Sequence, residues 1–278
     1  MKRTSRGIER IAAKKGPNYQ SRLQAAYRKL LKQSGRIVRR ARVLCEHVGL
    51  PAATADDIFG PHTLQAFIAR TERVQETARR RVLQGERVPN NEKLFSMFEP
   101  HTQLFKRGKA GQPVQFGRLV LVYEDAAGFL IHHQLMPRDA GDKDVVVEQT
   151  RLVQNRFHDR IERASFDRGF HSPENQEQLA QIVPCLCLPK PGRKQSVEQH
   201  STAGEEFLAA QQNHPGVESA IGALQSGNGL KRCRDQTEPG YDRYLSLGIL
   251  GRNLHTLGRL LIARGSPQSE AAQTRRAA

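Results

Sequence analysis

The sequence predicts an α/β fold that is preceded by a basic helical hairpin and followed by a long C-terminal helix. Three observations support this fold class. Apolar residues recur at helical spacing between about residues 18 and 83. Short β-branched runs then alternate with helical patterns between residues 114 and 188. A leucine-rich helical pattern follows at residues 241–262.

Positive charge is the strongest feature of the composition. The 278 residues contain 44 Lys and Arg against 28 Asp and Glu, which gives a net charge of +16. Residues 1–48 alone hold 14 Lys and Arg and 2 Asp and Glu, so +12 of this excess lies there. A charge of this size indicates a polyanionic partner such as a nucleic acid. The alternative is a basic face that binds no ligand.

The cysteines and the apolar runs favour a reduced, cytoplasmic protein. Cys45, Cys185, Cys187 and Cys233 are too scattered for a disulfide framework, and no spacing suitable for a metal site accompanies them. No run of 18 apolar residues occurs, and Met1 leads directly into charged residues. We therefore expect neither a membrane span nor a secretory signal.

The first 85 residues predict a basic helical hairpin. Residues 1–17 lack periodicity, and we expect them to be frayed. A helix from residue 18 to 48, ended by Gly49 and Pro51, places apolar residues on one face and Lys and Arg on the other. A second helix is expected at 63–83. The basic face either follows a phosphate backbone or is only solvated. Its candidate DNA-binding residues are Arg28, Lys29, Lys32, Arg36, Arg39 and Arg40.

Residues 86–113 predict an irregular basic loop, because prolines, glycines and basic residues alternate there with phenylalanines. Such a loop could contact a nucleic-acid backbone and stack on bases. Alternatively, Phe95, Phe98 and Phe105 pin the loop to the core. The candidate DNA-binding residues in this stretch are Lys106, Arg107 and Lys109.

Residues 114–264 give the pattern of the α/β region. Two β-branched runs, 114–123 and 129–135, form a hairpin around residues 124–128. His132 and His133 are adjacent in a strand, so they should point to opposite faces. The further elements are a helix at 143–157, a strand at 161–166, a helix at 173–181, a strand at 182–188, a linker at 189–203, a helix starting at 217–224, the helix at 241–262 and a disordered tail at 265–278.

An aspartate stands at the end of the strand at 161–166. Asp167 is followed by Arg168, Gly169 and Phe170, and Ser172 is then placed as the N-cap of the next helix. This order predicts a strand, an acidic tip, a tight turn and a helix. The carboxyl end of such a strand is where open α/β sheets bind ligands and metals. The alternative is an ordinary aspartate that caps a turn.

Six short segments, taken together and in this order, resemble bacterial insertion-sequence transposases with an IS4-like DDE catalytic domain. The similarity covers roughly residues 17–262. Its segments are Glu86–Phe95 (ERVPNNEKLF), Phe98–Thr102 (FEPHT), Lys106–Val114 (KRGKAGQPV), Phe116–Gly117, Asp167–Phe170 (DRGF) and Gly229–Cys233 (GLKRC).

The resemblance implies a ribonuclease-H-like sheet in which three carboxylates hold two Mg²⁺ ions for DNA strand cleavage and transfer. Asp167 would be the second catalytic and metal-binding acid and Glu218 the third. Arg168, Lys231 and Arg232 would join the DNA-binding set, with insertion-sequence ends and target DNA as partners. Around Glu218 the chain departs from the family, because Gln211, His214 and Gln225 replace an aromatic, a basic residue and a lysine. The alternative for Glu218 is a solvated residue near a helix N-terminus.

The first acid of the family has no counterpart in the predicted elements. It should lie on a strand before residue 17, and Asp125, Asp139 and Asp142 fall in a turn and a loop instead. We therefore expect a truncated copy with an incomplete ribonuclease-H-like sheet, inactive as an enzyme by itself. An upstream product could supply the missing strand, and a homo-oligomer is a further possible partner. The alternative function is a non-catalytic basic nucleic-acid-binding protein.

This interpretation makes a topological prediction. The absent strand would be central, so the sheet should split into the hairpin of residues 114–135 and the strand pair 161–166 and 182–188. We expect the hairpin to be antiparallel, the pair to be parallel, and no strand from residues 1–113 to lie between them.

Overall fold

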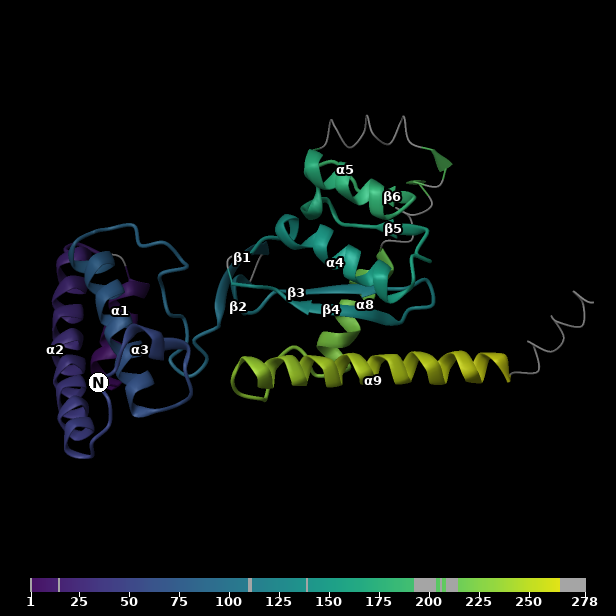
Figure 1. The fold of residues 1–278 in the computed structure, drawn as a ribbon. Coiled ribbons are helices and arrows are strands. Elements are labelled where there is room, and N and C mark those ends of the chain that lie inside the picture. The colour runs from purple at the N-terminus through teal and green to yellow at the C-terminus, as the bar shows by residue number, and fades with distance from the viewer. Residues whose placement is uncertain are drawn as a thin grey trace, which may run out of the picture. The chain divides into compact units, whose positions relative to one another are not determined.

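The computed structural model shows a mixed α/β structure that is mostly helical (Figure 1). It describes residues 2–14, 16–109, 112–138, 140–192, 204–205, 207–208 and 215–265, with the backbone alone at 107–109, 112–113 and 215–218. Contacts divide the chain into two units, Met1–Arg118 and Leu119–Ala278. Most of the predicted linker at 189–203 and of the predicted tail at 265–278 lies outside the described residues.

The first unit begins with a helix, α1 (Lys2–Ala13), so the expectation of a frayed N-terminus is wrong for these residues. Ile8 and Ile11 are partly buried on one face of α1. The hydroxyl of Thr4 donates a hydrogen bond to Oε1 of Gln33 in the next helix at 3.0 Å. Two isoleucines make too short a pattern to predict a helix, and α1 is stabilised by its packing on that neighbour.

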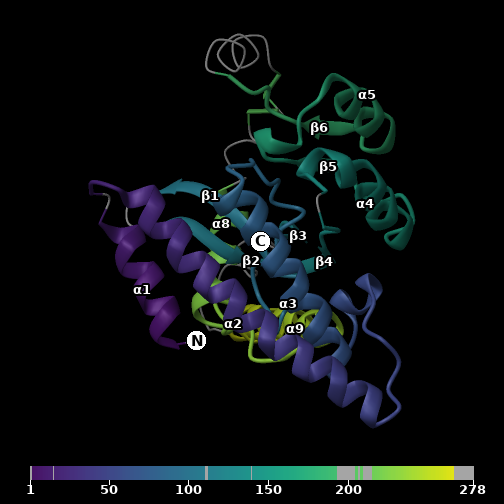
Figure 2. The ribbon, with the colours of Figure 1, turned by 90° about the vertical axis from the view of Figure 1, so that its left-hand side faces the viewer.

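The predicted helical hairpin is confirmed. Its helices are α2 (Tyr19–His47) and α3 (Leu64–Ala78), with a 3₁₀ turn η1 (Ala55–Phe59) before α3 and a π-helical turn η2 (Arg79–Leu83) after it. Val38 and Cys45 of α2 bury against Ile68 of α3. Figure 2 shows α2 with α1 on one side and α3 on the other. Helix α2 therefore packs against both of its helical neighbours.

An antiparallel strand pair replaces part of the expected irregular loop. It consists of β1 (Gln103–Lys109) and β2 (Gln112–Gly117), with Leu104 opposite Phe116. The predicted strand 114–123 is therefore interrupted near Arg118. Its first part belongs to β2, which pairs antiparallel with the preceding strand β1. The hydrogen bonds between β1 and β2 join backbone groups. They can therefore form here although the glycines and lysines of the sequence are typical of a loop.

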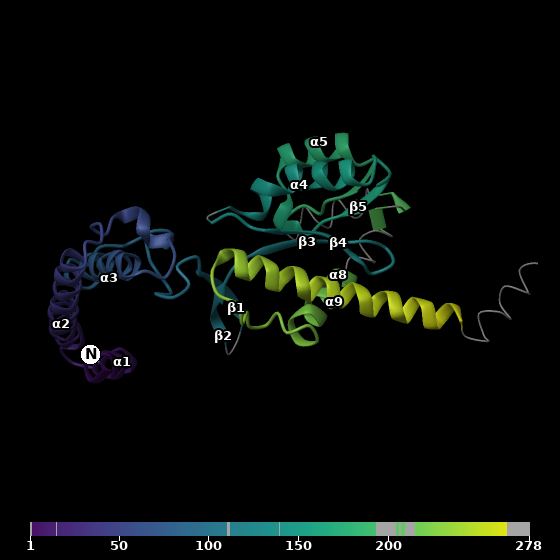
Figure 3. The same ribbon diagram turned by 60° about the horizontal axis from the view of Figure 1, so that its bottom comes forward.

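The second unit is built on the predicted antiparallel hairpin, β3 (Val120–Glu124) and β4 (Leu130–Leu135). One face of the hairpin is covered by α4 (Asp142–Arg156), and the other by α8 (Pro215–Ser226) and α9 (Glu238–Arg264) (Figures 1 and 3). His132 bonds to Gln149 of α4, and His133 bonds to Ser246 of α9. The prediction that the two histidines point to opposite faces is confirmed.

The predicted parallel pair is also confirmed. It is formed by β5 (Arg163–Ser165) and β6 (Cys185–Cys187), which α5 (Pro173–Ile182) connects. Its core consists of Val146, Phe166, Leu179 and Leu188. Among the described residues, the strands that begin before residue 114 are β1 and β2, and they pair with each other. As predicted, the described strands from residues 1–113 do not join β3–β4 to β5–β6.

The backbone of α9 at Gly248 lies close to the side chain of Leu230, in the loop that precedes this helix. A Cβ added at Gly248 would lie 2.8 Å from Cδ2 of Leu230. We expect Gly248→Ala to lower the free energy of unfolding by about 1–3 kcal/mol, because the two groups overlap. Gly258→Ala on the same helix is the control, since a Cβ there meets nothing within 4 Å. Gly258→Ala should raise the free energy of unfolding, measured by urea denaturation, by about 0.5–1 kcal/mol. Equal effects of the two substitutions would contradict this packing.

Candidate nucleic-acid interface and metal site

The segment around Asp167 has the predicted order of strand, acidic tip, turn and helix. Phe166 is buried, whereas Asp167 and Arg168 are exposed directly after β5. The turn is a 3₁₀ helix, η3 (Arg168–Phe170), in which the N–H of Phe170 donates to the carbonyl of Asp167 at 3.1 Å. The hydroxyl of Ser172 then accepts from the N–H of Asn175 at 3.0 Å, as expected of an N-cap.

A buried asparagine holds this turn in place. The side-chain amide of Asn175 donates to the carbonyl of Phe170 at 3.0 Å and to the carbonyl of Lys143 at 2.9 Å. Lys143 belongs to the first turn of α4, so the acidic tip is tied to the start of that helix. Burial lowers the pKa of the neighbouring His171, and the charges of Lys190 and Lys143 lower this pKa further. The hydrogen bonds of Asn175 therefore hold the turn that follows Asp167 beside the first turn of α4.

A second carboxylate lies at the same tip. Oδ2 of Asp142, the first residue of α4, is 3.1 Å from where a Cβ on Gly169 would be. The sequence analysis placed Asp142 in a loop, whereas it is the first residue of α4. Asp125 accepts hydrogen bonds from the N–H groups of Ala127 and Phe129, which agrees with its predicted place in the hairpin turn.

The backbone of Glu218 belongs to α8, and its side chain is outside the described part of the chain. Ala220 and Leu224, which are buried on α8, pack with Val120 and Leu130 of the β3–β4 hairpin.

The carboxylates at the tip are oxygen donors of the kind that Mg²⁺ prefers. Within the described side chains, however, no group of three or more His, Cys, Asp or Glu residues could hold a metal ion. Asp167 and Asp142 thus do not complete the donor set that the transposase resemblance implies.

The six candidate basic residues of α2 share one face of the helix. At about 100° per residue they fall within a sector of about 120° that extends about 18 Å along the axis. The buried residues Ser34, Val38 and Cys45 lie on the opposite side. All six are exposed: Arg28, Lys29, Lys32, Arg36, Arg39 and Arg40. We call this set the α2 basic face.

Carboxylates do not neutralise the α2 basic face within the described part of the chain. The acidic residues of this unit that form ion pairs do so with other arginines. Glu72 pairs with Arg42 at 2.5 Å, and Glu76 pairs with Arg79 at 2.8 Å. Glu86 and Glu92 both pair with Arg80. The six charges are therefore exposed, and no described carboxylate forms an ion pair with them.

Other basic residues of this unit are structural. Arg70 is fully buried, and its guanidinium donates to the carbonyls of Ile58 at 2.8 Å, Gly60 at 2.7 Å and Met97 at 3.2 Å. It also lies over the ring of Phe67, 5.3 Å from the centroid. Burial lowers the pKa of Arg70, which the charge of Glu99 partly offsets. A count of basic residues in the sequence does not distinguish the buried Arg70 from the exposed residues of the α2 basic face.

A second positive cluster lies near β1. Lys106 is exposed on that strand, whereas the side chains of Arg107 and Lys109 are outside the described residues. Burial lowers the pKa of the Lys93 ammonium, and the charges of Arg81, Lys106 and Arg87 lower it further. The sequence analysis missed Arg81, Arg87 and Lys93. Burial is the larger cause of this shift, and the three neighbouring cations add to it.

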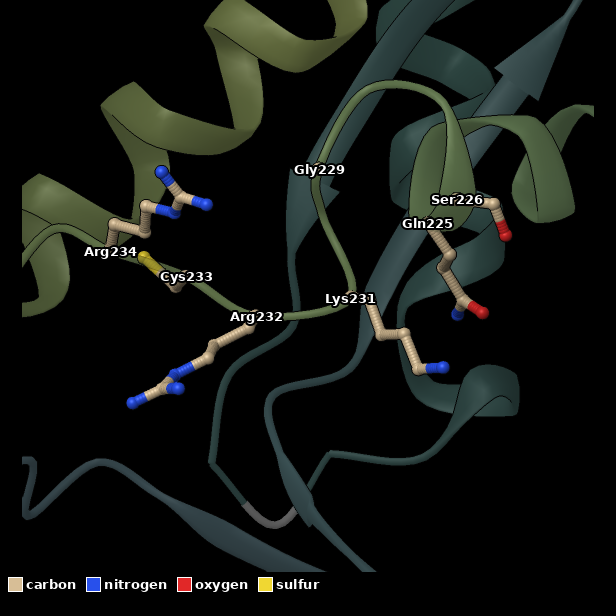
Figure 4. A pocket seen from close by; sticks show the side chains of 7 residues that line it. All are labelled: Gln225, Ser226, Gly229, Lys231, Arg232, Cys233 and Arg234. Carbon is tan, nitrogen blue, oxygen red and sulfur yellow. The ribbon is translucent and has the colours of Figure 1, made fainter.

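Lys231 and Arg232 lie in the loop between α8 and α9, at a hollow of about 830 Å³ (Figure 4). Their side chains point away from each other, and Arg234 also lines the hollow. The loop is held by a hydrogen bond from the hydroxyl of Tyr244 to the carbonyl of Gly229 at 3.2 Å. Arg168 is not part of this group, because it stands beside α4, on the other face of the hairpin. Arg234 was missed, although it continues the basic run.

Comparisons of the chain with protein-family models, with curated proteins and with solved structures found no match. Among the described helices, none has both the length and the apolar character needed to cross a membrane.

Proposed function

We propose that this chain contains part of the catalytic region of a DDE transposase of bacterial insertion sequences and that it binds DNA. The observation that supports DNA binding is the α2 basic face, six exposed cations on one side of a helix that have no carboxylate partner among the described residues. The transposase identity rests on the sequence resemblance around residues 86–117, 167–170 and 229–233.

The α2 basic face would bind the phosphate backbone of DNA. Each Lys or Arg that neutralises a phosphate releases condensed counterions, so the affinity should fall steeply with salt. Lysine and arginine on a surface helix can contact phosphates without reading base edges, and such binding is independent of sequence. Lys106, Lys231 and Arg232 are exposed and would add contacts of the same kind.

Asp167 would be the second acid of the DDE set and Glu218 the third. Asp167 is exposed at the carboxyl end of β5, and Asn175 fixes the turn that follows it. The family's Mg²⁺ ions would supply the activation of water for phosphodiester cleavage. Because the family's first acid has no counterpart in the predicted elements, we propose that this chain by itself binds DNA without cutting it.

We therefore expect no nicking of a supercoiled plasmid when the chain is incubated with Mg²⁺ or Mn²⁺. Asp167→Asn should behave as the unmodified chain does, and so should Asp125→Asn, the control in the hairpin turn. Metal-dependent nicking that Asp167→Asn abolishes and Asp125→Asn leaves intact would show that a complete active site is present.

A second candidate function is a nucleic-acid-binding protein with no relation to transposition, because the α2 basic face could bind a phosphate backbone in either case. Reading the DNA upstream of the Met1 codon separates the two candidates. A transposase origin predicts an apolar strand that ends in aspartate, encoded upstream in one of the three forward frames. A sequence without it would favour the second candidate.

A further inference from the structure

The two cysteines of β6 lie on the same face of the β5–β6 pair. Cys185 and Cys187 are two residues apart in the strand, and side chains at that spacing point the same way. Between them, Leu186 packs on the opposite face, against the core that contains Phe166 and Leu179. The two thiols therefore share one side of this small sheet, and neither takes part in a disulfide.

The thiol of Cys187 is buried but has polar neighbours. Its residue is 1% exposed, and the thiol donates a hydrogen bond to the carbonyl of Phe207 at 3.7 Å. Burial raises the pKa of this thiol, and a hydrogen bond with Ser165, its partner in the strand register, offsets part of the rise. The sulfur is therefore protonated at neutral pH. Its proton is the one that a metal ion would replace, because the thiolate is the form that binds metals.

Cys185 gives this pair of thiols a side that solvent can reach. It is only partly buried, in contrast to Cys187. The residue opposite Cys185 in the register is Arg163 of β5, which is exposed. Side chains paired in this way lie on the same face of a sheet, so a permanent positive charge stands beside the thiols. Such a charge favours the ionised form of a neighbouring cysteine.

Strand geometry favours a shared metal ion over a disulfide between these two sulfurs. Residues two apart in a strand have Cα atoms about 6.6 Å apart. Disulfides usually join cysteines whose Cα atoms are about 5.5–6 Å apart, with the sulfurs at about 2.0 Å. Two metal–sulfur bonds of about 2.3 Å place the sulfurs about 4.6 Å apart instead. This wider span fits two side chains that project from the same face of one strand.

We propose that Cys185 and Cys187 together bind one Cu(I) ion. Thiolates are soft ligands that select Cu(I) over hard cations such as Mg²⁺. Two sulfurs are too few for a four-cysteine zinc site, but they suffice for Cu(I), which two thiolates commonly bind in a line. Binding replaces the two S–H protons and leaves a bis-thiolate complex with one negative charge, which the guanidinium of Arg163 offsets.

The test is the transfer of Cu(I) from its coloured bicinchoninate complex to the full reduced chain in the absence of oxygen. We expect one tightly bound Cu(I) per chain, with an ultraviolet absorption from thiolate-to-metal charge transfer. The affinity should rise with pH, because binding releases two protons. Zn²⁺ in about tenfold excess should not displace the Cu(I), because the site lacks the four ligands that Zn²⁺ takes.

Cys185→Ser and Cys187→Ser should each lower the Cu(I) affinity at least 100-fold and abolish this absorption. The matched control is Cys233→Ser, a partly buried cysteine outside β6 that should leave both unchanged. Circular dichroism checks the fold of each variant, and Cys185→Ser tests the site even if replacing the buried Cys187 unfolds the unit. An unmodified chain that takes no Cu(I), or equal binding by Cys185→Ser, would overturn the proposal. Neither outcome depends on DNA binding, so the proposed function is tested separately.

Discussion

Replacing the α2 basic face with glutamine should lower the affinity for DNA by about 100-fold or more at low salt, because counterion release by these cations supplies the binding free energy. The variant changes Arg28, Lys29, Lys32, Arg36, Arg39 and Arg40 together, and all six are exposed. Glutamine has a high helix propensity, so α2 should remain folded. Fluorescence anisotropy with a short random duplex measures the change.

The control for this variant removes the same charge elsewhere. It replaces six exposed basic residues of the second unit with glutamine, namely Arg151, Arg160, Arg163, Lys190, Arg259 and Arg264. If net charge alone attracted DNA, both variants would lose the same affinity. The proposal requires a much larger loss for the α2 variant, and equal losses would disprove a localised interface.

Arg70→Met should destabilise the first unit by about 3–5 kcal/mol, because it leaves buried carbonyls without hydrogen bonds. The guanidinium is the shared donor for Ile58, Gly60 and Met97, which belong to segments on either side of α3 in sequence. Methionine fills part of the volume but donates to none of them. Urea unfolding followed by circular dichroism should show an earlier transition for this unit.

Arg73→Met is the matched control on the same helix. Arg73 is only partly buried, and its Nε donates to one carbonyl, that of Glu92, at 2.9 Å. We expect its substitution to cost about 1 kcal/mol, as for a single hydrogen bond. Similar losses for Arg70→Met and Arg73→Met would contradict the assignment of Arg70 as the anchor of these segments.

Local sequence signals were sufficient for several elements. The helix α2 and its exposed basic residues follow from a long apolar period, which needs no knowledge of the tertiary structure. The tip at Asp167 follows from Ser172 and Pro173, whose capping roles are local. The strand pairing of β3–β4 and β5–β6 was also predicted correctly.

Features that depend on contacts between distant residues were not predictable in the same way. The pairing of β1 with β2 joins segments whose glycines and lysines resemble a loop. Asp142 reaches the turn at Gly169 only because α4 and η3 pack together. Arg70 and Arg36 are identical in type, yet one is buried under backbone carbonyls and the other is exposed. Burial of this kind is decided by the fold and not by the residue.

The salt dependence of DNA binding tests the central claim most directly. A plot of log Kobs against log salt has a slope of about −0.9 for each phosphate neutralised, so six contacts from the α2 basic face give a slope of about −5 or steeper. The six-residue glutamine variant should show a slope that is shallower by several units, while the control in the second unit keeps the original slope. If the α2 variant and the unmodified chain give the same slope, the α2 basic face does not bind DNA.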